Sequence, residues 1–142
     1  MTDTRVIIFH KHPVSAKVRF LKQAYGGICG FEALPDLASV LDDEALEKED
    51  NVFNHPTVVA RQAEQFLGLD EEGLAIEPDY LERVDVPQGL VKVYLLGLKG
   101  HDTPDEQLAE QGASLHLITE MRNLPAAEME LLRRAYVAIM EG

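Results

Sequence analysis

Residues 123–140 constrain the fold most strongly, because they have the pattern of an amphipathic helix. Pro125 stands in the first turn, where the missing N–H of proline costs nothing, and Glu130 precedes Arg134 by the spacing of a surface ion pair. The apolar positions recur at helical intervals: Met129, Leu132, Tyr136 and Ile139. Such a stripe predicts a helix packed against another layer of the protein.

Length and composition favour one globular domain spanning residues 1–142, because 46% of the residues are hydrophobic. No apolar run approaches the ~18 residues of a membrane span, and the N-terminal residues lack the features of a signal peptide. Cys29 is the single cysteine, which predicts a buried structural thiol and no internal disulfide. We therefore expect a cytoplasmic protein that does not interact with membranes.

Charge is unevenly distributed along the chain. The net charge of −12 argues against nucleic acid as a partner, since binding to phosphates needs positive charge. Between Thr4 and Phe31 there is no acidic residue, whereas acidic residues predominate from Glu32 to Glu82. The early basic residues are Arg5, Lys11, Lys17, Arg19 and Lys22. The basic region either receives an anion or an acidic partner surface, or faces the acidic region within one fold.

Helical and strand patterns alternate through most of the chain. Predicted helices begin near Val14, Pro35, Pro56, Asp105 and Pro125 and end near Tyr25, Ala45, Gly68, Gln111 and Met140. Predicted strands cover 5–9, 28–31, 80–86, 90–98 and 113–118, with a hairpin turn at 87–89. This alternation predicts an α/β or α+β fold. Its mixed β-sheet should have about four or five strands and be flanked by about four or five helices.

Polar turns follow three of the predicted strands and precede prolines. If those strands are parallel, the turns meet at the carboxyl edge of the sheet, where ligands bind in open α/β sheets. The candidate ligand-binding residues are His10, Lys11, His12, His101, Asp102, Glu120 and Arg122. Their cationic groups and the expected helix N-termini suit a phosphate or carboxylate. The alternative is that each turn contains only capping and solubilising residues.

Other chemistries have little support in the sequence. No established metal-binding spacing occurs, so we predict no metal site, and no cofactor is indicated. Ser15 and Cys29 lack the surroundings of an activated nucleophile.

Three functions remain open. The first is a small binding or accessory domain for a partner protein or a small anionic ligand. The second is an enzyme in which His10, His12 or His101 acts as acid or base and Lys11 or Arg122 holds an anion. The third is an inhibitory protein whose acidic residues, 42–50 and 70–72, mimic a polyanion. A homodimer through residues 123–140 is also compatible with the wide apolar surface of that helix.

Overall fold

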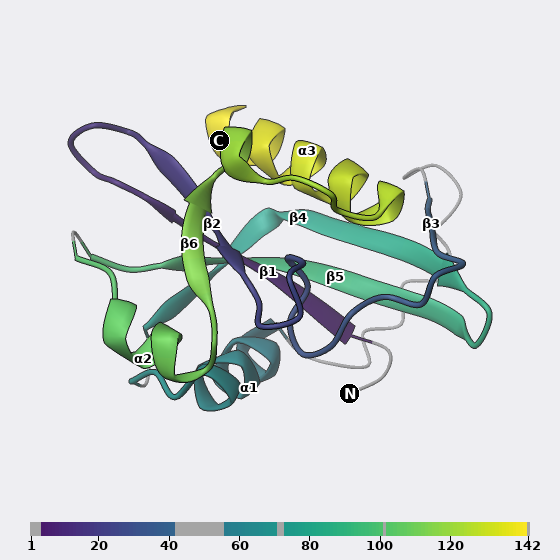
Figure 1. Cartoon of the computed structure of the whole chain (residues 1–142), viewed down its shortest axis with the longest axis horizontal. Helices are drawn as coiled ribbons and strands as arrows, with labels where there is room; N and C mark the ends of the chain where they lie inside the picture. Colours follow the sequence, from purple (N-terminus) through teal and green to yellow (C-terminus); the bar gives the residue numbers. More distant parts are fainter. Residues whose placement is uncertain (1–3, 42–55, 71–72, 101, 142) are drawn as a thin grey trace.

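A computed structural model describes residues 4–41, 56–70, 73–100 and 102–141. Within these ranges the chain is an α+β domain in which helices pack against a curled, mixed sheet that forms a half-barrel (Figure 1). The strands are β1 (Thr4–Lys11), β2 (Val18–Lys22), β3 (Ser39–Val40), β4 (Leu74–Val86), β5 (Gly89–Leu98) and β6 (Ser114–Leu117). The helices are α1 (Pro56–Leu67), α2 (Asp105–Glu110) and α3 (Ala126–Glu141), and a 3-10 turn, η2, covers Ile118–Glu120.

The strands lie in the order β3-β4-β5-β1-β2-β6. Hairpins join β1 to β2 and β4 to β5, so these pairs are antiparallel. β1 and β5 form a parallel pair at the centre, and β2 pairs antiparallel with β6. The prediction of a mixed sheet is therefore confirmed. The described residues contain more strands and fewer helices than we expected.

Both faces of the central pair are buried, as their continuous apolar sequences predict. On one face, Ile7, Phe9 and Leu95 belong to a core that is completed by Leu131 and Leu132 of α3. On the other face, residues of β1 and β5 pack with α1 and α2 in a second core. The sheet is thus covered on both sides (Figure 1).

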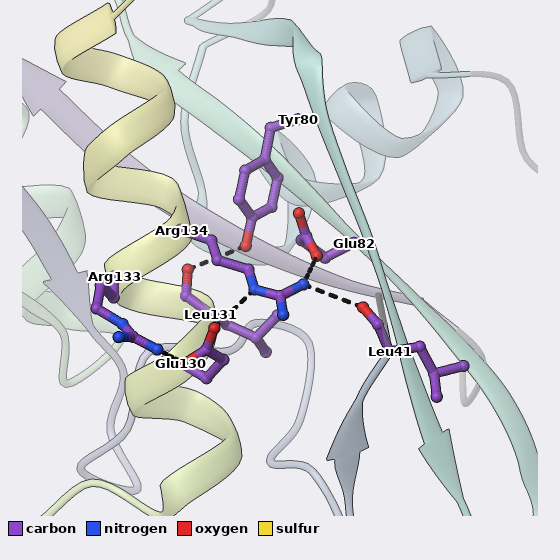
Figure 2. Close-up of polar contacts among 7 residues, drawn as sticks. All are labelled: Leu41, Tyr80, Glu82, Glu130, Leu131, Arg133 and Arg134. Atoms are coloured by element: carbon purple, nitrogen blue, oxygen red, sulfur yellow. Dashed lines mark hydrogen bonds and ion pairs between the residues drawn. The ribbon is translucent and has the colours of Figure 1, made fainter. Parts of the chain in front are cut away.

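Arg134 ties α3 to the sheet, as Figure 2 shows. Its Nε donates to Glu130 Oε2 at 2.8 Å, and its Nη1 donates to Glu82 Oε1 on β4 at 2.6 Å and to the Leu41 carbonyl at 3.0 Å. The Tyr80 hydroxyl donates to the Leu131 carbonyl at 3.1 Å. The predicted pair of Glu130 and Arg134 is confirmed, and it belongs to a larger contact that fixes the helix over β4.

The predicted helix from Val14 to Tyr25 is wrong. These residues form the turn of a hairpin and then β2, in which Val18, Phe20 and Leu21 are buried. Val14 and Tyr25 are exposed, so the apolar face inferred from helical spacing does not exist. Pairing with β1 and β6 has overridden a local pattern that fitted either structure.

The predicted helix from Pro35 is also not observed. Its described part contains bends and the two-residue strand β3, and residues 42–45 lie outside the described residues. The expected strand at 28–31 is reduced to a bridge between Val6 and Gly30. In α3 the buried positions are shifted from the predicted stripe, since Leu131, Leu132, Ala135 and Ile139 are buried and Met129 is exposed.

The remaining elements agree with the sequence patterns. The helix ending at Gly68, the hairpin with its turn at 87–89, the short helix after Pro104 and the following strand are all present. β4 begins earlier than predicted, at Leu74, and an irregularity in its pairing with β5 lies between Ile76 and Leu81. Bulges of this kind let a strand bend, which fits the curled sheet.

Candidate functional site

The three polar turns lie at the same edge of the sheet. β1 and β5 are parallel, and β6 points the same way because both β1 and β6 are antiparallel to β2. His10, Arg19 and Leu117 occupy one row across β1, β2 and β6. The condition on which the predicted edge depended is therefore met, although the turn after β1 leads into a hairpin and offers no helix N-terminus.

His10 links the first two turns but is hidden from solvent. Only 1% of the residue is exposed, and its Nε2 lies 2.8 Å from the carbonyl oxygen of Gly100 in the loop after β5. Because a carbonyl only accepts, Nε2 carries the proton in this contact. His10 therefore fastens the end of β1 to the loop after β5, and its contacts favour a structural role.

His12 organises the hairpin turn. Its Nδ1 accepts hydrogen bonds from the main-chain N–H groups of Val14 and Ser15, both at 3.2 Å. The carbonyl of His12 accepts from Ala16 N–H at 2.9 Å, and its N–H donates to the Lys17 carbonyl at 2.9 Å. This short turn includes Ala16 at a φ of +60°, and the imidazole supports it.

The hairpin turn extends beyond the neighbouring strands. Pairing of β1 with β5 ends at Phe9, and pairing of β2 with β6 reaches only to Arg19. Residues 11–18, which we call the basic arm, therefore pair only with each other along the sheet (Figure 1). Lys11 and Lys17 are exposed on this arm, and Val14 at its end is 80% exposed.

The other predicted site residues lie apart from the arm's turn. Asp102 is exposed in the loop after β5, and His101 lies outside the described residues. Glu120 in η2 turns back on its own segment, where its Oε1 accepts from Leu117 N–H at 2.7 Å and lies 3.9 Å from His116 Nδ1. Arg122 is exposed after η2. The residues thus share an edge without forming one compact constellation.

Three pockets lie in the described part of the chain, one beside a predicted site residue and two away from these residues. One of about 300 Å³ lies beside Asp102 and Lys99, between the loop after β5 and the end of α1. Another of about 410 Å³ lies along β3. The largest of these three, about 510 Å³, lies at the opposite end of the sheet and includes Arg5 in its wall.

Arg5 is a buried, pocket-lining cation that the sequence interpretation overlooked. It was listed with the early basic residues and not among the candidate site residues, yet it is only 3% exposed. The available signal was its position, since it begins a strand whose following residues are wholly apolar. A charged side chain at such a position must either reach solvent or be buried with hydrogen-bonding partners.

A buried cluster around Cys29 joins the N-terminal region to α3. Glu128, in the first turn of α3, accepts from Ile28 N–H at 2.8 Å and from the Tyr25 hydroxyl at 3.0 Å. The same hydroxyl accepts from Cys29 N–H at 2.9 Å. Burial, reinforced by the negative charge of Glu128, raises the pKa of the Cys29 thiol well above its ordinary value. The prediction of a buried cysteine is confirmed.

Among the described residues, no group of three or more His, Cys, Asp or Glu side chains is placed to hold a metal ion. No described helix is both long and apolar enough to cross a membrane. Compared with known proteins, the sequence matches no family model and no curated protein. The candidate site must therefore be interpreted from its own geometry.

Proposed function

We propose that this protein is a binding domain whose basic arm docks on an acidic surface of a partner protein. The observation that carries the proposal is the extension of residues 11–18 beyond both neighbouring strands, with Lys11 and Lys17 exposed. Exposed ammonium groups on a narrow arm can approach a partner without steric hindrance from the rest of the domain. Because the rest of the chain is strongly negative, the arm differs in the sign of its charge from the surface around it.

The contacts of the arm support binding more than catalysis. His10 and His12, the described histidines on which the acid/base alternative depends, are engaged with a carbonyl and with main-chain N–H groups. The side chain of Val14 provides an apolar contact at the end of the arm. An apolar centre with a charged rim is typical of protein interfaces. The polyanion-mimic alternative rests largely on residues 42–50 and 71–72, which lie outside the described residues.

The test uses a decaglutamate peptide as a model acidic surface, followed by amide NMR shifts of the full chain. We expect shifts centred on residues 11–17 at about 20 mM salt, which weaken several-fold at about 300 mM because the charges are exposed. The double variant Lys11→Gln/Lys17→Gln should lose this binding. The matched control Arg133→Gln removes an exposed charge on α3 and should retain it.

Other outcomes would overturn the proposal. Equal binding by the double variant would show that the arm is not the docking element. Inorganic phosphate that bound the arm as strongly as the peptide would favour a small anion over a protein surface.

A further inference from the structure

The largest of the pockets described above combines apolar walls with one buried cation. It lies where β1 and β5 begin, at the end of the sheet away from the basic arm. Its apolar wall consists of Leu34, Pro35, Val86, Leu90 and Val91. Its volume of about 510 Å³ lies within the range of small-molecule sites.

The guanidinium of Arg5 is held firmly in this wall. Its side chain is 4% exposed. Nη1 donates to the Thr4 carbonyl at 3.0 Å, and Nη2 donates to the Ala33 carbonyl at 3.2 Å. These contacts fix the orientation of the cation before any ligand arrives, which lowers the entropic cost of binding.

Glu32 is a loose neighbour of this cation. Its Oε1 lies 3.9 Å from Nη2 of Arg5, beyond hydrogen-bonding distance, and its side chain is 55% exposed. An exposed carboxylate at this distance gains little from the ion pair, because water screens the charge. A carboxylate brought into the pocket by a ligand could approach Nη2 more closely than Glu32 does.

We propose that this pocket binds a small organic acid, a monocarboxylate joined to an apolar body. The carboxylate takes the place of Glu32 at Nη2 of Arg5, and the apolar body lies against Leu34, Val86 and Leu90. Burial of the apolar part supplies affinity, and the charge-assisted hydrogen bond supplies selectivity for the acid. This site is separate from the basic arm and does not depend on the function proposed for it.

Arg5 also has a structural role, since its bond to Ala33 anchors the loop at residues 32–35. The two roles predict different behaviour for Glu32. If Arg5 only anchors the loop, removing the charge of Glu32 leaves ligand binding unchanged. If Arg5 receives the ligand, the Glu32→Gln variant removes a competing carboxylate and strengthens binding of the acid.

The experiment compares 1-naphthoate with the neutral 1-naphthamide on the full chain, using methyl NMR shifts of the leucines and valines of the pocket. We expect naphthoate to bind at least about tenfold more tightly than the amide. Glu32→Gln should tighten naphthoate binding a few-fold and leave amide binding unchanged. Arg5→Gln should abolish the preference, and Lys11→Gln on the basic arm should preserve it.

Three results would overturn the inference: equal binding of acid and amide by the unaltered protein, shifts centred outside the pocket, or no effect of Glu32→Gln on naphthoate. The Glu32 variant keeps the test decisive if Arg5→Gln fails to fold. Decaglutamate binding to the arm is measured in parallel, so failure at one site is distinguishable from failure at the other.

Discussion

The two ends of β1 carry the same sign of charge in opposite environments. At its start, the guanidinium of Arg5 is buried and bonded to main-chain carbonyls. At its end, Lys11 is exposed on the basic arm. Exposed charge acts over a distance and is weakened by salt, whereas a desolvated charge acts at contact and discriminates between ligands. One strand therefore places positive charge in two contrasting environments, which the two proposals above assign to different anions.

The largest change in the free energy of unfolding is expected for a comparison between the packed part of β2 and the exposed end of the arm. Phe20 is fully buried in β2, so Phe20→Ala should lower the free energy of unfolding by about 3–5 kcal/mol. Val14, at the exposed end of the arm, should tolerate alanine within about 0.5 kcal/mol. Urea denaturation followed by circular dichroism measures both. A cost at Val14 comparable with that at Phe20 would show that the arm packs against the domain.

A smaller effect compares the two ends of β1 directly. Arg5→Gln should lower the free energy of unfolding by about 1–3 kcal/mol, because the carbonyls of Thr4 and Ala33 lose their donors. Lys11→Gln should change it by no more than about 0.5 kcal/mol. The same denaturation assay applies to this pair. Equal values for the two variants would remove the distinction between a buried and an exposed end.

The effect that is smallest at neutral pH appears only under alkaline conditions. Burial raises the pKa of the Cys29 thiol above its ordinary value of 9.0 and that of the Tyr80 hydroxyl above 10.0. Both groups are neutral when protonated, so their contribution to stability is complete below about pH 9. It falls at higher pH, because the unfolded chain releases these protons first.

Each of these groups should lower the free energy of unfolding by up to about 1.4 kcal/mol per pH unit once the unfolded form ionises. Denaturation curves between pH 8 and 11 measure this slope. Cys29→Ala should flatten its first part, whereas Lys11→Gln should not. A Cys29→Ala profile identical to that of the unaltered protein would contradict the assignment.

Sequence patterns predicted the elements whose local preference agrees with their final packing. Residues 126–141, 56–67 and 89–98 are examples, because their periodicity and flanking prolines or glycines point to the same structure. The helix predicted from Val14 to Tyr25 was wrong, because apolar residues at spacings of four, three and four also occur by chance in a turn followed by a strand. The decisive pairing there, between Phe9 and Phe20, joins two strands of the hairpin. The spacing of apolar residues within 14–25 contains no information about this pairing.

The candidate site was predicted only as far as its edge of the sheet. Parallel pairing of β1 with β5 joins residues that are far apart in sequence, such as Thr4 and Lys92, and local patterns carry no information about it. Whether the three turns lie at one edge of the sheet could therefore be established only from the structure. Burial of Arg5 was missed for a similar reason, because its surroundings come from residues 32–35 and 86–91.

The pairing of β1 with β5 also has a consequence for how the chain is made. β1 leaves the ribosome before its parallel neighbour exists, since β5 starts only at Gly89. During that interval the apolar run Val6–Phe9 has no central partner, and such exposed segments are prone to aggregate. Arg5 and Lys11 flank this run on either side. Their charges would then act as gatekeepers, which keep nascent chains apart until the sheet can close.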